Sequence, residues 1–447
     1  MMTFVESRTG IARARRWQWV VVLAMLSSAE MTFAQVGWPE FRGPYANGHV
    51  EGEAGETALP LHWNETENVV WRTAIPHRGW STPVVLGNDV WLTTATEDGH
   101  EFFAIAVDAT SGQIRINKQV FHCDNPEPLG NAVNCYASPS AAVEPGRVYV
   151  HFGSYGTACL DAADGDILWQ RQDLPCRHYR GPGSSPILFE NLLMLTFDGV
   201  DVEYVAALDK ASGETVWKTD RTTAWNDLDE QGKPKREGDM RKAYSTPFII
   251  EAAGKTQMLS IGSSCAFSYD PRTGAEIWKA SLVGYTPATR PVYADGLAFI
   301  TSGRGKAELL AIRVDGEGDV TNSHVAWKFE GPDVPQEPSP VLVDGLLYIV
   351  SNGGTVTCLE AGSGAVVWSE RIGGNYVTSP ILAGGRLYFC STQGKTVVLR
   401  AGRAFEVLAE NALDEGFMAS PAAVGKALFL RSKTHLYRIE EATSPGP

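Results

Sequence analysis

Short hydrophobic runs separated by turn residues make up most of the chain from Val69 onward. Two examples are GLLYIVS at residues 345–351 and GRLYFC at residues 385–390, where an apolar run directly follows a glycine. Alternating or continuous apolar runs of this length, bounded by Gly or Asn, predict β-strands joined by tight turns. No long stretch with a helical period follows residue 34, so the pattern predicts an all-β fold.

A Ser/Thr-Pro pair followed by a short apolar run recurs along the chain. It occurs at Thr82-Pro83, Ser138-Pro139, Ser185-Pro186, Thr246-Pro247, Ser339-Pro340, Ser379-Pro380 and Ser420-Pro421, and Arg290-Pro291 fills the one remaining gap. Successive starts lie 40 to 61 residues apart, a period that suits four-stranded propeller blades with loops of varying length. The repeat therefore predicts an eight-bladed β-propeller.

A second phrase ends the third strand of each repeat: an acidic residue, a glycine four positions on, and a tryptophan after four more. Its members are Asp161, Gly165 and Trp169; Asp209, Gly213 and Trp217; Asp270, Gly274 and Trp278; and Gly364 and Trp368 after Glu360. The carboxylate can accept backbone N–H bonds in the turn, and glycine supplies a positive φ. The tryptophan then lies on the outer strand, where we expect it to pack between blades. Ile116 and Val407 replace it in two repeats.

The two ends of the repeat region complement each other. The last repeat stops after residues 436–439 without the tryptophan phrase, whereas Trp71 and its strand precede the first repeat. Pairing the two halves gives one blade, so we expect an N-terminal strand to close the ring and remove its open edges. The predicted boundaries are a signal peptide at 1–34, an N-terminal extension at 35–68, the propeller at 69–441 and a C-terminal tail at 442–447.

The first 34 residues have the pattern of a secretory signal. Four arginines precede an apolar run at residues 17–26, and Thr32-Phe33-Ala34 offers small residues for cleavage after Ala34, with Ala29 as a second site. The run is too short to be a stable membrane anchor, and no later stretch is long enough to span a bilayer. We expect a periplasmic or extracellular protein without a transmembrane segment.

The net charge bears on the class of partner, and the cysteines bear on disulfides and metal sites. The net charge of −14 argues against nucleic acid or anionic lipid as a main partner. Among the seven cysteines, Cys123 and Cys135 flank one loop and could form a disulfide, with Cys176 as a competing partner. The other four lie in strand patterns and read as buried apolar residues. No spacing typical of a metal site occurs, so we predict no metal ligands, and we expect a monomer.

The repeated phrase, the period and the eightfold count resemble the tryptophan-docking repeats of the quinoprotein (PQQ-like) family over residues 69–440. The segments WPEFRGP at 38–44 and WNETENVVW at 63–71 resemble the exported PQQ-like repeat proteins typical of planctomycete-type bacteria. This resemblance implies the propeller fold. It leaves activity open, because the same repeat builds both quinoprotein dehydrogenases and the outer-membrane assembly propeller of Gram-negative bacteria, which is not an enzyme.

The enzyme branch of the family implies a quinone on the ring axis, a calcium ion held by carboxylate and amide oxygens, an Asp base and, in many members, two adjacent cysteines. This chain has no Cys-Cys pair and no segment that matches the ligand or base motifs, so no catalytic role is assigned. We therefore predict a binding or scaffolding module of the cell envelope without a cofactor. The alternative is a dehydrogenase that uses PQQ and calcium to oxidise an alcohol or sugar.

Residues just before each repeat start should converge on one mouth of the channel, the natural binding site of a propeller. The candidates are cationic or aromatic: Arg78, Trp80, Tyr136, His178, Tyr179, Arg180, Lys242, Tyr244, Arg290 and Tyr376. The cations could attract a carboxylate or a sulfated or uronic sugar, and the aromatic rings could stack on a ring or sugar. The partner would then be an anionic small molecule, a glycan or an envelope protein. Alternatively, these side chains fill the channel and pair with Glu337 or one another.

Overall fold

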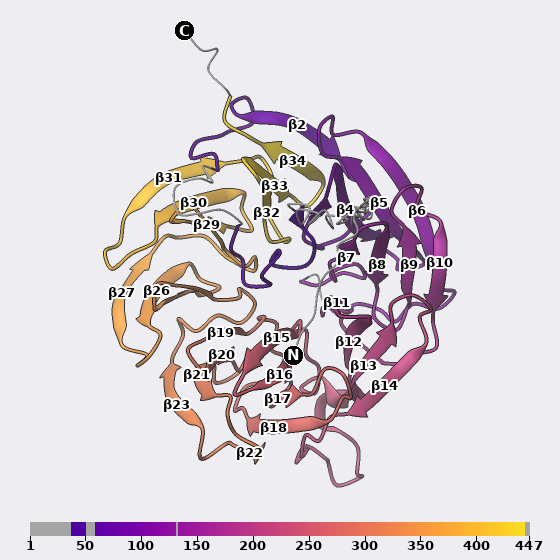
Figure 1. Ribbon diagram of the computed structural model, residues 1–447, viewed down its shortest axis with the longest axis vertical. Helices are drawn as coiled ribbons and strands as arrows, with labels where there is room; N and C mark the ends of the chain where they lie inside the picture. The colour runs from indigo at the N-terminus through magenta and orange to yellow at the C-terminus, as the bar shows by residue number, and fades with distance from the viewer. Residues whose placement is uncertain (1–36, 51–58, 131–132, 443–447) are drawn as a thin grey trace, which may run out of the picture. The chain divides into compact units, whose positions relative to one another are not determined.

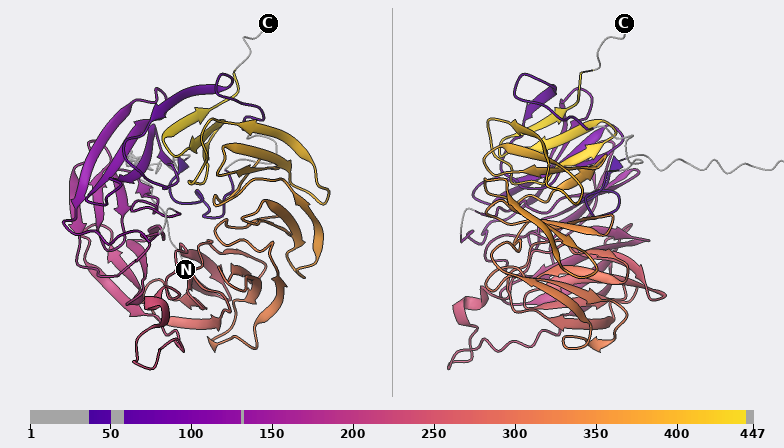
Figure 2. Two further views of the ribbon diagram at one scale, coloured as in Figure 1. Left: turned by 180° about the vertical axis from the view of Figure 1, so that it is seen from behind. Right: turned by 90° about the vertical axis from the view of Figure 1, so that its left-hand side faces the viewer.

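The computed structural model describes residues 37–50, 59–130 and 133–442 of the chain. The predicted signal peptide and residues 443–447 of the predicted tail lie outside the described residues. Within them the strands form eight sheets arranged around a central axis, as Figures 1 and 2 show, which confirms the all-β, eight-bladed propeller. The ladders are antiparallel, except that β22 pairs in parallel with β18.

Each blade runs from an inner strand at the axis to an outer strand at the rim. Blade 1 contains β1 (Gly37–Trp38), β3 (Val84–Leu86), β4 (Asp89–Ala95), β5 (Glu101–Asp108) and β6 (Ile114–His122). Blade 2 contains β7 (Ala142–Glu144), β8 (Arg147–His151), β9 (Thr157–Asp161) and β10 (Ile167–Arg171). Blade 3 contains β11 (Ile187–Phe189), β12 (Leu192–Asp198), β13 (Glu203–Asp209) and β14 (Thr215–Asp220).

The next blades follow the same order. Blade 4 contains β15 (Phe248–Ala252), β16 (Lys255–Gly262), β17 (Cys265–Tyr269), β18 (Glu276–Ser281) and β22 (Gly318–Asp319). Blade 5 contains β19 (Val292–Ala294), β20 (Leu297–Thr301), β21 (Glu308–Arg313) and β23 (Val325–Glu330). Blade 6 contains β24 (Val341–Val343), β25 (Leu346–Val350), β26 (Thr355–Glu360) and β27 (Val366–Arg371).

The last two blades complete the ring. Blade 7 contains β28 (Ile381–Ala383), β29 (Arg386–Cys390), β30 (Lys395–Arg400) and β31 (Val407–Ala412). Blade 8 contains β32 (Ala422–Val424), β33 (Ala427–Arg431), β34 (His435–Ile439) and the N-terminal β2 (Val69–Ala74). A single 3₁₀ turn, η1 (Lys235–Gly238), lies in the connection between β14 and β15, which projects from one face of the ring in Figure 2.

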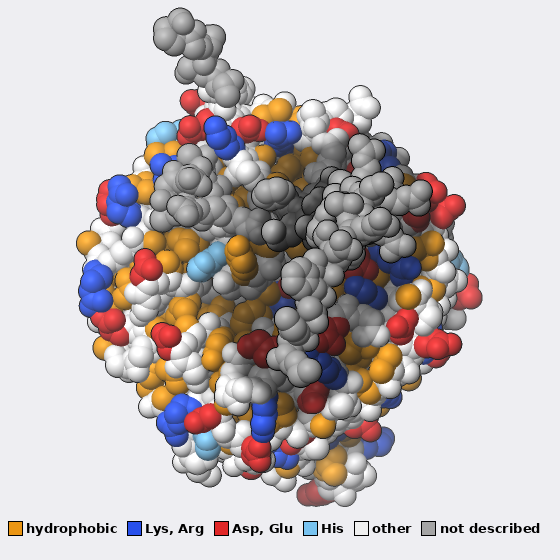
Figure 3. Space-filling view, viewed as in Figure 1, with side chains coloured by type: hydrophobic (Ala, Val, Ile, Leu, Met, Phe, Trp, Pro, Cys, Tyr) orange, Lys and Arg blue, Asp and Glu red, His pale blue; other side chains and the backbone are white. Residues whose placement is uncertain are grey.

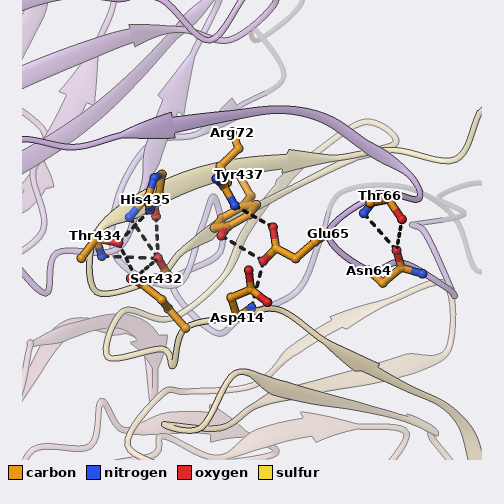
Figure 4. A network of polar contacts seen from close by, with 10 residues as sticks. Asn64, Glu65, Thr66, Arg72, Asp414, Ser432, Thr434, His435 and Tyr437 are labelled. Carbon is orange, nitrogen blue, oxygen red and sulfur yellow. Dashed lines mark hydrogen bonds and ion pairs between the residues drawn. The ribbon is translucent and has the colours of Figure 1, made fainter.

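The ring closes by pairing of the N-terminal strand β2 with β34, as predicted. Thr73 and Leu436 face each other in this antiparallel ladder. Glu65, just before β2, binds elements from both ends of the chain: Arg72 Nη1 at 3.0 Å, the Tyr437 hydroxyl at 3.2 Å and the Asp414 amide at 2.8 Å (Figure 4). Closure therefore rests on a ladder together with a shared polar network.

Tryptophans join neighbouring blades in a repeated geometry. Trp169 Nε1 donates to the Lys210 carbonyl of the next blade at 3.0 Å, and its ring covers Gly213, where a Cβ would lie 2.7 Å from the indole. Gly213 has φ +76°, and the Asp209 carboxylate accepts the amides of the same turn, Ser212 at 2.9 Å. The corresponding tryptophans in the other docked blades are Trp71, Trp217, Trp327 and Trp368.

One blade departs from this pattern. Trp278 is fully buried in a core cluster shared by blades 4 and 5, but its Nε1 donates to Gln257 Oε1 of its own blade at 3.0 Å. β22, from the connection between β21 and β23, pairs with the outer edge of β18. Trp327, which the repeat phrase did not single out, docks on Gly364 in the usual way. Ile116 does lie where a tryptophan would, with its Cγ2 2.8 Å from a Cβ placed on Gly165.

A belt of Ser and Thr hydroxyls links the inner ends of the blades. The amide of each belt residue donates to the hydroxyl of the next, at 2.9 Å in six links. The belt residue of blade 2 is Ser140, not Ser138 of the predicted repeat start. The Ser138-Pro139 pair would begin the inner strand at residue 140, but β7 begins two residues later, at Ala142, and the belt position shifts with it. In blade 5, Arg290 takes the belt position and interrupts the chain of hydroxyls.

The hydrophobic core lies between the blades, and strands at middle radius are buried on both faces. All seven residues of β12 are buried. On the face seen in Figure 3, basic and acidic side chains are interspersed among hydrophobic ones. Residues 37–50, 59–130 and 133–442 include no helix long and apolar enough to cross a bilayer.

Candidate functional site

The N-terminal extension enters the channel and binds its walls (Figure 1, indigo). β1 adds an innermost strand to blade 1, and the Pro39 carbonyl accepts the Val143 amide of blade 2 at 2.8 Å. Farther along, the Val50 amide donates to the Leu382 carbonyl of blade 7 at 2.9 Å. Residues 37–50, which we call the plug, therefore contact blades 1, 2 and 7.

Buried charges fix the plug. Arg290 Nη2 lies 2.9 Å from the Glu40 carboxylate, and its Nε donates to the Pro247 carbonyl at 2.9 Å. Arg42 is buried and bonds to backbone oxygens of blades 6 and 7, including Pro340 at 2.6 Å. Burial lowers the pKa of Arg42 to about 9, and the positive charge of Arg290 adds to this effect. The guanidiniums of Arg42 and Arg290 and the carboxylate of Glu40 thus leave one net positive charge where the plug meets the channel wall.

A cavity of about 370 Å³ lies on the axis. Phe41 of the plug lines it, together with six hydroxyl residues at or near the belt positions, Thr82, Ser140, Ser185, Thr246, Ser379 and Ser420. Its aromatic walls are Trp80, Tyr244 and Tyr285, and its charged lining residues are Arg180, Arg236, Asp239, Lys242, Arg304 and Glu337. This size lies in the range of pockets that take small molecules.

Three of the four cations in the lining, Arg180, Lys242 and Arg304, have carboxylate partners among the described residues. Arg180 Nε and Nη2 donate to the two Asp239 oxygens at 3.0 and 3.2 Å, and Lys242 binds the same carboxylate. Hydrogen bonds from Arg180 and Lys242 outweigh burial and hold the pKa of Asp239 below its usual value. Arg304 pairs with Glu337 at 2.6 Å on the other side of the lining. Cations still outnumber carboxylates among the lining residues by four to two.

Two buried donors in the lining have no hydrogen-bond partner in the described structure: Trp80 Nε1 and Thr286 Oγ1. Thr286 also has φ +49°, a left-handed conformation that is costly for a β-branched residue. Buried polar groups are normally bonded, and residues held in this region of φ are concentrated at binding and active sites. Both features make the cavity the candidate binding site of the described structure.

The structure brings four of the ten candidates together in the cavity: Trp80, Arg180, Lys242 and Tyr244. Tyr179 lies behind them, with the Arg180 and Lys242 cations 5.0 and 5.5 Å from its ring centre. Arg78 packs over the Trp80 ring at 4.9 Å outside the lining.

The other four candidates have neighbours away from the cavity lining. Tyr136 is buried against Phe102 and bonds to the Glu127 carbonyl at 2.9 Å. Tyr376 is fully buried between blades 6 and 7, and Arg290 binds the plug. His178 is buried and accepts the Ser154 amide at 3.0 Å through Nε2.

The cysteines are unpaired thiols in the structure. All seven lie among the described residues; Cys123 is half-buried and the others are buried. Cys135 Sγ lies 3.3 Å from the Ser138 hydroxyl, and Cys176 Sγ lies 3.8 Å from His178 Nδ1. Neither disulfide considered from the sequence, Cys123 with Cys135 or a pair that includes Cys176, is formed in the structure.

Buried histidines predict a pH dependence of stability. Burial lowers the pKa of His151 to about 3 and that of His178 to about 4. In the unfolded chain these histidines have a pKa near 6.5 and become protonated below that pH, whereas in the folded state they stay neutral. The free energy of unfolding therefore falls as pH drops from 6.5. We expect a loss of about 1.6 kcal/mol from each histidine between pH 6.5 and 5. Urea titrations should show this decline, and His178→Gln should remove the share of that one histidine, about 1.6 kcal/mol; an unchanged slope would contradict the assignment.

Sequence reasoning missed several lining residues. Asp239 lies in the long connection between β14 and β15, which the sequence marks only as a polar insertion. Tyr285 and Thr286 come from the connection between blades 4 and 5, and Arg304 comes from the β20–β21 loop of blade 5, where it stands between two glycines. The two glycines were the one signal in the sequence, because closely spaced glycines favour a turn with positive φ. In the structure Gly303 and Gly305 have φ +83° and +89°.

Comparison with protein families agrees with this architecture. The family model described as outer membrane protein assembly factor BamB matches residues 54–172 and 201–445, more than half of the chain. The chain belongs to this family. No curated protein matches the sequence.

Solved structures of two kinds share the fold. Quinohemoprotein alcohol dehydrogenase from Comamonas testosteroni has a TM-score of 0.67 at 14% identity, over 92% of this chain and 82% of that chain. A europium-containing methanol dehydrogenase has a TM-score of 0.63 at 12% identity, over 91% and 98%. BamB from Moraxella catarrhalis has a TM-score of 0.57 at 12% identity, over 85% and 99%. These likenesses show the fold alone.

The residues present do not fit a quinone with calcium. Calcium takes six to eight oxygen ligands, usually with several carboxylates. The two carboxylates that line the cavity, Asp239 and Glu337, are both bound to cations, and the described part of the chain brings no three His, Cys, Asp or Glu side chains together as a metal site. No catalytic step is therefore derived.

Proposed function

We propose that this protein is an exported binding module of the cell envelope that takes a small anionic ligand in the axial cavity. The observation that carries the proposal is the blind pocket itself: the plug lies across the channel, and Phe41 lines a cavity with cationic and aromatic walls. The lining residue Thr286 is held at φ +49°, a costly backbone conformation that supports a ligand over a cavity filled only by its own side chains.

The electrostatics favour an anion. Arg431 is buried directly behind the wall and bonds to the Ser81 carbonyl at 3.0 Å, between the lining residues Trp80 and Thr82. Burial lowers its pKa to about 10. Neither Arg431 nor Arg42 has a carboxylate partner among the described residues, so both make the interior more positive than the protein surface.

The test fills the cavity. Ala288 lines it, so Ala288→Trp should place an indole inside and reduce binding at least 10-fold. Ala365→Trp, in an exposed turn before β27, is the matched control and should bind normally. Isothermal titration would use glucose, glucuronate, a sulfated hexose and benzoate as probes. If no probe binds, or if binding survives Ala288→Trp, the cavity is not the site and the proposal is wrong.

A further inference from the structure

We infer that the ligand is an acidic sugar, whose carboxylate replaces the Asp239 side chain between Arg180 and Lys242 while its hydroxyls face the belt. This inference rests on the proposed function and specifies the ligand of the same cavity. Asp239 already shows what the two cations bind: one carboxylate, held by both nitrogens of Arg180 at 3.0 and 3.2 Å and by Lys242.

The Asp239 carboxylate is placed to be exchanged. It belongs to the connection between β14 and β15, whereas Arg180 belongs to the connection between blades 2 and 3. All three side chains line the cavity. The connection has anchors on two blades apart from Asp239: Trp225 Nε1 donates to the Glu203 carboxylate of blade 3 at 2.7 Å, and the Ser263 hydroxyl of blade 4 donates to the Met240 carbonyl at 2.5 Å. Release of the Asp239 side chain would therefore leave the connection held.

The belt favours a sugar over a plain organic acid. Ser140, Ser185 and Ser420 each accept a backbone N–H of the preceding blade at 2.9 Å. A hydroxyl has one proton of its own and a second lone pair, so each can still donate to and accept from a group in the cavity. A ring of such groups matches a ligand that carries hydroxyls on several sides.

The walls suit a sugar ring as well. Trp80 and Tyr244 present aromatic surface to the cavity, and Tyr244 packs against Gly183, where a Cβ would come within 2.7 Å of its ring. Aromatic rings of this kind stack on the apolar faces of sugars while polar groups reach the ring hydroxyls.

Three ligands separate the elements of the inference in isothermal titration: glucuronate, glucose without the carboxylate, and benzoate without the hydroxyls. We expect glucuronate to bind at least 10-fold more tightly than either. Equal affinity for glucose removes the carboxylate site, and equal or tighter binding of benzoate removes the sugar. The benzoate outcome leaves the proposed function standing, provided that Ala288→Trp still reduces binding at least 10-fold, whereas equal affinity for neutral glucose also contradicts an anionic ligand.

Variants test the exchange. Asp239→Asn removes the internal carboxylate and should tighten glucuronate binding about 10-fold while leaving the affinity for glucose unchanged. Arg180→Ala should weaken glucuronate binding about 10-fold or more. A tenfold change in affinity is within the contribution of one charge-assisted hydrogen bond. Asp227→Asn, in the same connection but outside the cavity, is the control and should change neither. Weaker or unchanged glucuronate binding in Asp239→Asn would overturn the exchange.

Discussion

Replacing Arg290 with leucine will destabilise the propeller by about 3 to 5 kcal/mol, because it leaves a buried carboxylate without its cation. Arg290 is 1% exposed, and its guanidinium binds Glu40 at 2.9 Å. It also donates to the Pro247 carbonyl at 2.9 Å and to the Phe41 carbonyl, so the substitution removes contacts of both the blade and the plug. Urea denaturation of the Arg290→Leu variant against the unmodified chain measures the loss.

A double variant separates the ion pair from the lost packing. Glu40→Gln in the Arg290→Leu background removes the uncompensated charge and should recover roughly half of the loss, about 2 kcal/mol. A double variant no more stable than Arg290→Leu would show that the carboxylate is not the cause.

The pH dependence of the same variant gives a second check. Burial raises the pKa of Glu40, and Arg290 opposes that rise. Without Arg290 the pKa of Glu40 rises further, and a carboxyl whose folded pKa is raised loses stability as pH increases through that value. The deficit of Arg290→Leu should therefore be larger at pH 8 than at pH 5. An equal deficit at both values would contradict this.

The fold was predictable because its signals are local. Each tryptophan phrase specifies a turn within a few residues: Asp209 accepts amides two and three positions on, and Gly213 supplies the positive φ. The unmatched strand at Val69–Ala74 likewise predicted closure, since one blade lacked an outer strand. Local pattern failed at Trp278, whose Nε1 donates within its own blade, and the strand β22 that pairs with the outer edge of β18 comes from the connection between β21 and β23.

The site was less predictable because its residues meet only in space. Arg290 was visible as the odd member of the repeat starts, but its partner Glu40 lies 250 positions away in a segment without a repeat. Tyr136 and Tyr244 each lie two residues before a Ser/Thr-Pro pair, yet Tyr136 packs into the core against Phe102 and Tyr244 lines the cavity. A small change in loop geometry decides which way such a side chain turns, and the repeat pattern does not encode it.

Replacing Trp71 with alanine should destabilise the ring by about 3 to 5 kcal/mol, the usual range for removing a packed tryptophan. Trp71 Nε1 donates to the Ala109 carbonyl of blade 1 at 2.9 Å, and its ring covers Gly112 and packs at 6.1 Å from Phe429. The residue therefore joins blade 1 to the blade that contains both ends of the ring.

The matched control is Trp169→Ala, which removes the same contact from the interior of the chain. Trp169 also bonds to a carbonyl of the next blade, Lys210 at 3.0 Å, and covers a glycine, so the two losses of stability should agree within about 1 kcal/mol. They should differ in hydrogen exchange. Loss of Trp71 weakens the one blade whose strands are not continuous in sequence, so the amides of β2 and β34 should exchange faster in Trp71→Ala alone. Equal exchange of these strands in both variants would mean that the ladder and Glu65 close the ring without the tryptophan. Backbone pairing, and not docking between blades, would then stabilise the closure.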